Sequence, residues 1–146
     1  MIRRATIEDL DDRLMPIIEE FYGSSKFLKN FNKNHCIGMW KKFIANNLGI
    51  IFLLIDKEEI VGFLAALKYP DILTGNLTAT EMAWFVKESQ RGKGLFLLKE
   101  FEKWAKSERC KSIIMVHLMD SMPKKLENIY QRMGYESVEI HHKKEI

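Results

Sequence analysis

Apolar residues recur in the first third of the chain at steps of three and four residues. These steps connect the apolar positions of residues 10–21 and, separately, those of residues 36–48. The spacing places the apolar side chains on one helix face, so both segments are predicted to be amphipathic helices whose stripes join the core. Thr6 and Asp9 have the spacing of a capping box at the start of the first helix, and Pro16 is expected to kink that helix.

Continuous apolar runs follow, and they are typical of buried strands. Residues 50–55 and 60–67 are apolar on both faces and are joined by the charged turn 56–59, which predicts a hairpin of two central strands. Residues 69–78 contain proline, glycine and asparagine and are predicted to be a loop. The next strand is expected over residues 79–86.

The remaining segments complete an alternating order of strands and helices. A helix is predicted from Pro123 to Met133, with Gly134 as its C-terminal cap. The other predicted elements are a first strand at 2–5, a helix at 95–106, a strand at 113–118 and a last strand at 135–142. The order β-α-α-β-β-β-α-β-α-β predicts an α/β fold with a sheet of mixed direction.

Composition indicates one globular domain over residues 1–146. The chain is 47% hydrophobic and 29% charged, and no repeat or linker-like stretch divides it. The longest apolar runs are far shorter than the roughly 20 residues of a membrane-spanning helix, so no membrane partner is expected. Cys36 and Cys110 lack the spacing of metal ligands and are predicted to be free structural thiols. A cytoplasmic location is predicted.

The charge balance narrows the choice of partner. A net charge of +3 with an isoelectric point near 8.8 falls short of the clustered basic surface that a nucleic-acid-binding domain shows. Nucleic acid is therefore disfavoured as a partner, and an anionic cofactor explains the basic balance equally well.

A glycine-bearing turn is the main candidate for chemistry. The segment Gln90-Arg91-Gly92-Lys93-Gly94 lies between a predicted strand and a predicted helix. The first N–H groups of a helix have no intrahelical partner, and glycines let the backbone approach a phosphate, which Arg91 and Lys93 could pair with directly. The pattern matches neither a P-loop nor a Rossmann fingerprint. Taken alone, the pentapeptide fits an ordinary turn equally well.

The wider context resembles the GNAT superfamily of N-acetyltransferases. Val86, the glycine turn and the apolar helix resemble motif A of that superfamily, Gln/Arg-x-x-Gly-x-Gly/Ala, with Gly94 at the first glycine position and Phe96 at the last. Two further similarities lie near the ends of the chain, in Ile2-Arg3-x-Ala5-Thr6-x-Glu8-Asp9 and in Leu126-x-x-Ile129-Tyr130-x-x-x-Gly134-Tyr135. The resemblance therefore spans nearly the whole chain.

The resemblance implies a mostly antiparallel central sheet flanked by helices, an acetyl-CoA cosubstrate and no metal. It implies that the strand before the turn splays from its neighbour, and that Tyr130 protonates the departing CoA thiolate. The residues implied to bind acetyl-CoA are Trp84, Val86, Gln90, Arg91, Gly92, Lys93, Gly94 and Leu95. The superfamily's asparagine seven residues before the tyrosine is replaced by Pro123, so its role is not transferred.

Glu81 is the candidate general base. An amine must lose a proton to attack a thioester, and a carboxylate among Met82, Ala83 and Trp84 is expected to have a raised pKa. A solvent-facing strand glutamate is an equally good interpretation from the sequence.

These observations predict an N-acetyltransferase that moves an acetyl group to a primary amine by direct attack. The acceptor is not identified. The resemblance implies that residues 22–33 and 70–78 form the groove that binds it, and a homodimer is left open. Phe96 and Pro123 motivate one alternative, an inactive module that binds acyl-CoA. The basic, aromatic residues 26–33 motivate another, a small nucleic-acid-binding protein.

Overall fold

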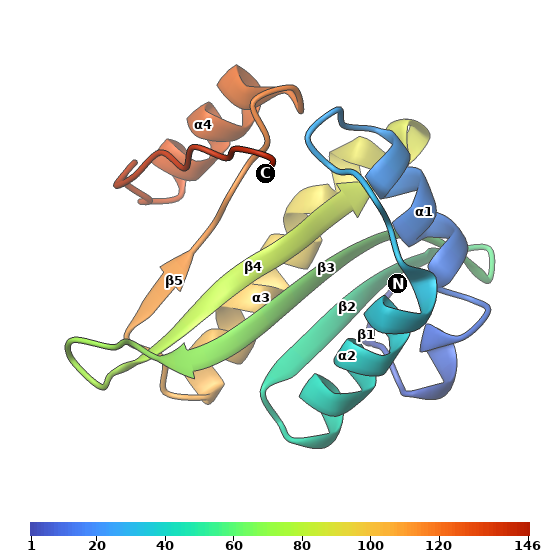
Figure 1. The fold of residues 1–146 in the computed structure, drawn as a ribbon, viewed down its shortest axis with the longest axis horizontal. Coiled ribbons are helices and arrows are strands. Elements are labelled where there is room, and N and C mark those ends of the chain that lie inside the picture. The colour runs from blue at the N-terminus through green and yellow to red at the C-terminus, as the bar shows by residue number, and fades with distance from the viewer. The chain divides into compact units, whose positions relative to one another are not determined.

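The computed structural model describes residues 1–146 as two units, Met1–Val116 and His117–Ile146, each described by itself below. The helices and strands are shown in Figure 1. The first unit contains β1 (Ile2–Arg4), the 3-10 turn η1 (Glu8–Leu10), α1 (Met15–Gly23), α2 (Lys33–Ala45), β2 (Gly49–Asp56), β3 (Glu59–Pro70), β4 (Leu77–Val86), the 3-10 turn η2 (Glu88–Lys93), α3 (Gly94–Ser107) and β5 (Ser112–Ile114). The second unit contains α4 (Pro123–Arg132).

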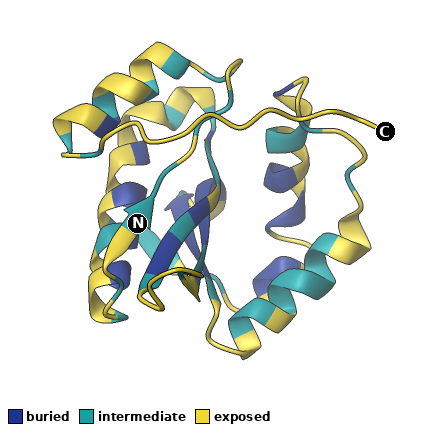
Figure 2. Ribbon diagram, turned by 60° about the vertical axis from the view of Figure 1, so that its left-hand side comes forward, coloured by how far each residue is buried: buried dark blue, intermediate teal, exposed yellow.

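The five strands form one sheet in the order β1-β2-β3-β4-β5. The pairings up to β4 are antiparallel and only β4 and β5 run parallel, so the predicted mixed, mostly antiparallel α/β fold is confirmed. Helices α1 and α2 lie on one face of the sheet, and α3 lies on the other (Figure 1). Buried residues fill most of β2 and β3, part of β4 and one side of α3 (Figure 2), so the core lies on both faces of the sheet.

The predicted central hairpin is confirmed. Strand β2 is buried except at its two ends, β3 is buried from Ile60 to Ala66, and the two strands pair with each other inside the sheet. Lys57 and Glu58 connect them with positive φ angles of 46° and 68°, the backbone that a two-residue hairpin turn requires. The pairing shifts by one residue between Leu54 and Ile55, which leaves Val61 as an extra residue in β3.

The prediction of one continuous helix over residues 10–21 is wrong. The structure has two short elements there, η1 and α1, and Pro16 lies in the first turn of α1 instead of kinking a longer helix. Proline is well tolerated in the first turn because its missing N–H would have no intrahelical partner.

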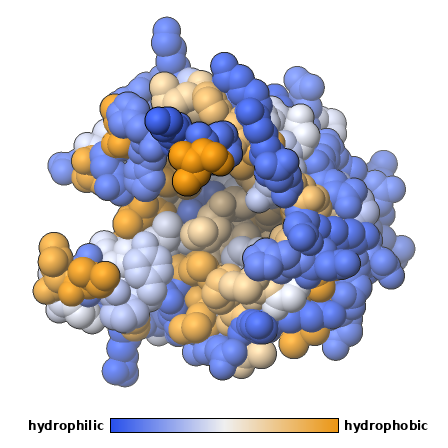
Figure 3. Space-filling model, viewed as in Figure 1, coloured by the Kyte–Doolittle hydropathy of each residue, from blue (hydrophilic) through white to orange (hydrophobic).

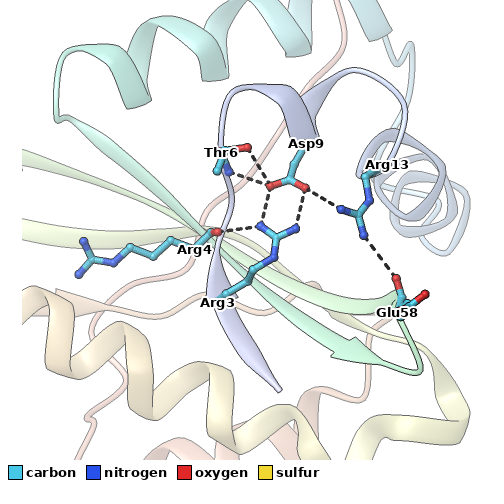
Figure 4. A network of polar contacts seen from close by, with 6 residues as sticks. All are labelled: Arg3, Arg4, Thr6, Asp9, Arg13 and Glu58. Carbon is cyan, nitrogen blue, oxygen red and sulfur yellow. Dashed lines mark hydrogen bonds and ion pairs between the residues drawn. The ribbon is translucent and has the colours of Figure 1, made fainter.

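A polar network holds the chain before α1 (Figure 4). The Arg3 guanidinium donates to both oxygens of Asp9 at 2.6 and 2.7 Å, and the Thr6 N–H donates to Asp9 Oδ2 at 2.8 Å. Arg13 lies 3.7 Å from the same carboxylate and donates to the backbone oxygen of Glu58. The network ties the N-terminal segment to the β2–β3 turn.

Helix α2 begins as the sequence predicts, but its apolar stripe is less buried than expected. The Asn32 side chain accepts the His35 N–H at 3.0 Å and caps the helix. Cys36, Trp40 and Ile44 pack against the core, yet no residue of α2 is fully buried. Cys36 and Cys110 are free thiols, as predicted.

The loop between β3 and β4 is shorter than the predicted 69–78, because β3 continues to Pro70 and β4 begins at Leu77. The Asp71 side chain accepts the N–H groups of Leu73 and Thr74 at 3.0 and 2.8 Å, which orders the loop. Ile72 and Leu73 are almost fully exposed, and Figure 3 shows apolar side chains gathered at this loop, at the left of the view.

In the second unit, α4 begins at Pro123 and is followed by Gly134 with a φ of 88°, as predicted. The predicted last strand over residues 135–142 is wrong: no strand follows β5, and Val138 and Ile140 are each 79% exposed. Alternating apolar residues form a strand only where a neighbouring strand and a buried face are available.

In the first unit, strand β5 is shorter than the predicted strand over residues 113–118. No helix of the chain is long and apolar enough to cross a membrane.

Candidate active site

The sheet opens between its last two strands. Thr78, Ala79 and Thr80 pair in parallel with β5, which then ends, while β4 continues to Val86. Beyond Thr80 the β5-facing edge of β4 therefore has no paired strand. This agrees with the divergence of the two strands that the resemblance implies.

Glu81 lies where the two strands separate. Its side chain is buried, with 3% of the residue exposed, and Oε2 accepts the backbone N–H of Val116 at 3.1 Å. Burial raises the pKa of Glu81 to about 8, although the hydrogen bond from Val116 acts in the opposite direction. The interpretation of Glu81 as a solvent-facing strand residue is therefore wrong.

A β-bulge adjoins Glu81 in the same strand. Glu81 pairs with Ala66 and Ala83 pairs with Ala65, so Met82 is an extra residue of β4 with a half-exposed side chain. Bulges of this kind often occur next to active sites, where they redirect a side chain. Here the bulge separates the buried carboxylate from the regular pairing that continues to Val86.

The glycine-bearing turn connects β4 to α3, as predicted. Residues 88–93 form η2, and Gly94 is the first residue of α3. A Cβ on Gly94 would lie 3.4 Å from both Trp84 Cζ2 and Val86 Cγ2. The first residue of α3 therefore packs closely against these two side chains of β4. Gly92 has no neighbouring atom within 4 Å of a built Cβ, which leaves open space beside the turn.

The charged side chains of the turn are exposed and already have carboxylate neighbours. Arg91 Nη1 lies 3.6 Å from Glu88 Oε1, and Lys93 Nζ lies 3.6 Å from Asp56 Oδ1. The Gln90 side chain donates to Asp56 Oδ2 at 2.9 Å. Two exposed cations, a helix N-terminus and the open space at Gly92 fit a pyrophosphate group.

Two apolar side chains of the first turn of α3 are also exposed. Leu95 and Phe96 are 38% and 56% exposed, so neither is packed into the core. Phe96 occupies the position where motif A has glycine or alanine.

Tyr130 is held between two rings within the second unit. Its ring is stacked with that of His117 at a centroid distance of 6.1 Å, and it lies 5.8 Å from the ring of Tyr135 in a tilted arrangement. Tyr130 is part of α4, one turn before Gly134. Aromatic contacts on two sides restrict the rotamers of the tyrosine.

Two residues near the site, Asp56 and Val116, could not be predicted from the sequence. Asp56 lies in the charged turn 56–59, and its contact with Gln90 joins positions far apart in the sequence. Val116 acts through its backbone N–H, which no side-chain pattern reveals.

Comparison with known proteins identifies the family. A sequence model described as the Acetyltransferase (GNAT) family matches residues 8–135, so the chain belongs to this family. Its members transfer acetyl groups and generally use acetyl-CoA as cosubstrate. No curated protein sequence matches the chain significantly.

Solved structures share the fold at low sequence identity. The chain is similar to a transcriptional regulator from Bacillus halodurans C-125, with a TM-score of 0.78, 20% identity, and coverage of 100% of this chain and 99% of that chain. A ribosomal-protein-alanine N-acetyltransferase from Brucella melitensis biovar Abortus 2308 has a TM-score of 0.76 at 14% identity, with coverage of 100% and 98%. A glucosamine-6-phosphate N-acetyltransferase from Arabidopsis thaliana has a TM-score of 0.75 at 14% identity, with coverage of 99% and 97%. At these identities the similarity shows the fold alone.

Proposed function

We propose that this protein transfers an acetyl group from acetyl-CoA to a primary amine by direct attack of the amine on the thioester. The observation that carries the proposal is the buried Glu81 carboxyl at the point where β4 leaves β5, within a chain of the GNAT family. Two of the structural neighbours are named as N-acetyltransferases, of a protein alanine and of an amino sugar, which supports an amine as the acceptor.

The turn before α3 is proposed to hold the phosphates of the cosubstrate. Acetyl-CoA supplies the activated acetyl thioester when it is bound. The N–H groups at the start of α3 attract negative charge, and Arg91 and Lys93 add direct pairing. The main-chain groups of β4 near Trp84 and Val86 are proposed to bind the pantetheine arm, because the pairing of β4 with β5 ends at Thr80 while β4 continues to Val86.

Glu81 is proposed to accept a proton from the attacking nitrogen. The Val116 N–H fixes one carboxyl oxygen, and the raised pKa makes the ionised form a stronger base than an exposed glutamate. With a pKa of about 8, roughly a tenth of the carboxyl is ionised at about pH 7. The rate is therefore expected to rise with pH and to level off above about pH 8.

Tyr130 is proposed to donate its phenolic proton to the departing CoA thiolate. The role follows from the spacing of Tyr130 and Gly134 in the family pattern. Protonation makes a thiolate easier to expel, and a positioned acid typically contributes roughly 10²- to 10⁴-fold to the rate.

The test is acetyl transfer to a panel of amines that includes amino sugars, peptides with free N-termini and small polyamines. Thiol release is followed with and without each amine, and the acetylated product is identified by mass. Amine-dependent thiol release with a matching acetylated amine supports the proposal. Binding of acetyl-CoA without transfer to any amine would instead support the inactive binding module that Phe96 and Pro123 suggest.

A further inference from the structure

Asp56 makes two contacts with the proposed phosphate-binding turn from a different part of the sheet. It is the last residue of β2, and its two carboxylate oxygens face two members of the turn. Oδ2 accepts the Gln90 side-chain N–H at 2.9 Å, and Oδ1 lies 3.6 Å from Lys93 Nζ. One carboxylate thus connects the β2–β3 hairpin to both sides of Gly92.

Backbone hydrogen bonds also connect the beginning of the turn to the hairpin. The Lys87 N–H donates to the carbonyl of Val61, the extra residue of β3, at 2.9 Å. The Gln90 N–H then donates to the Lys87 carbonyl at 2.8 Å. These bonds hold the beginning of η2 beside the hairpin, so the Asp56 side chain meets Gln90 without a long reach.

We propose that Asp56 is a positioning residue that holds the turn in the shape that binds the phosphates of acetyl-CoA. The inference rests on the proposed function. Asp56 touches neither the acetyl group nor the amine in this scheme, and it acts through the Gln90 side chain and the backbone that carries Gly92.

Asp56 could either position the turn through Gln90 or compete with the phosphates for Lys93. The relative strength of its two contacts decides between these effects. A carboxylate near a phosphate site repels the ligand and attracts Lys93 away from it, which would weaken binding. The contact with Gln90, however, is a hydrogen bond of normal length, whereas the contact with Lys93 is longer and both partners are partly exposed, at 48% for Lys93 and 35% for Asp56. Exposed ion pairs are weak, and hydrogen bonds to charged groups are stronger. Positioning through Gln90 should therefore dominate.

The experiment compares acetyl-CoA with S-acetylpantetheine, which carries the same thioester and lacks the phosphates. Steady-state constants are measured for wild type, Asp56→Ala, Asp56→Asn and the control Glu59→Ala. Glu59 pairs directly with Asp56 across the hairpin, is exposed, and has no hydrogen bond or ion pair with the turn, so its variant removes the same charge at a neighbouring position. Thermal unfolding of each variant checks that the fold is retained.

Asp56→Ala is expected to raise the KM for acetyl-CoA about tenfold, with kcat and the KM for S-acetylpantetheine unchanged. Asp56→Asn is expected to raise the KM for acetyl-CoA less, about threefold, because its amide oxygen still accepts from Gln90 but forms a weaker, uncharged hydrogen bond. Gln90→Leu should reproduce the effect of Asp56→Ala, and the double variant should add little, since both changes remove one contact.

Three results would overturn the inference. A lower KM for acetyl-CoA in Asp56→Asn would show that Asp56 competes with phosphate for Lys93. Equal loss with both substrates would show a general structural role, and no change in Asp56→Ala would remove Asp56 from the site. Absence of any wild-type reaction or binding with acetyl-CoA would overturn the proposed function itself and the inference with it.

Discussion

The replacement Glu81→Gln should make the protein more stable at neutral and alkaline pH while it removes the proposed base. The carboxyl is buried, and its one assigned hydrogen bond comes from the Val116 N–H, which an amide oxygen can also accept. Glutamine has nearly the same shape as protonated glutamate and cannot ionise. The variant therefore isolates the free-energy cost of a buried negative charge.

The magnitude follows from the shift in pKa. The carboxyl has an ordinary pKa of 4.5, and in the folded protein the value is about 8. Between these values the folded protein holds a proton that the unfolded chain has released, so the free energy of unfolding falls as the pH rises through this window. At about 1.4 kcal/mol per pKa unit the full shift corresponds to roughly 5 kcal/mol, of which roughly 3 kcal/mol is lost by about pH 7.

Urea unfolding of wild type and Glu81→Gln, followed by tryptophan fluorescence at about pH 5, 7 and 8.5, measures this difference. The free energy of unfolding of Glu81→Gln should rise relative to that of wild type by roughly 4 kcal/mol from the lowest to the highest of these pH values. Glu59→Gln, which removes an exposed carboxylate, is the control and should show no comparable trend. A constant difference between wild type and Glu81→Gln at all three pH values would refute the assignment of a buried, protonated carboxyl.

Three further predictions concern the fold and the proposed acid. Asp9→Asn should lower the free energy of unfolding by about 2 kcal/mol at neutral pH, because it removes the carboxylate that Arg3 holds in its charged form. The Arg3 guanidinium keeps the pKa of Asp9 well below its usual 3.8, so this difference should shrink in urea titrations as the pH falls below that value. Gly62→Ala would place a Cβ 3.0 Å from atoms of β4 and should cost about 1–3 kcal/mol in chemical unfolding, whereas Gly92→Ala, with open space around it, should cost little. Tyr130→Phe should lower kcat by roughly 10²- to 10⁴-fold with little change in the KM for acetyl-CoA, and wild-type turnover in this variant would remove the tyrosine from the mechanism.

The central hairpin could be predicted because its signal is local. Long apolar runs require burial on both faces, and four charged residues between them leave room only for a turn. The glycine turn and α3 were predictable for the same reason. Motif, strand end and helix start follow one another within a few residues.

Features that depend on distant partners could not be predicted. The alternation at 135–142 is that of a strand, yet no strand pairs with it, so Val138 and Ile140 remain exposed. Burial of Glu81 depends on where β5 ends and on the bulge at Met82. Neither the end of β5 nor the bulge can be predicted from the local sequence, because the register of the strands is set by packing across the sheet.

The first helix could not be predicted correctly for a different reason. Apolar spacing alone continues from Leu10 to Phe21, and Pro16 is compatible either with a kink or with a new first turn. The Asp9 network favours the second outcome, because it satisfies the backbone near Thr6 and ends the first element as a short turn.

Titration calorimetry with acetyl-CoA tests the central claim, that the turn before α3 binds the cosubstrate. Wild type is compared with Gly92→Gln and Gly92→Glu, two side chains of equal size at a position with open space, which differ only in charge. Binding by wild type and Gly92→Gln, and its loss in Gly92→Glu, is the predicted result, because the added carboxylate would repel the phosphates. No binding by wild type, or equal binding by all three proteins, would contradict the account.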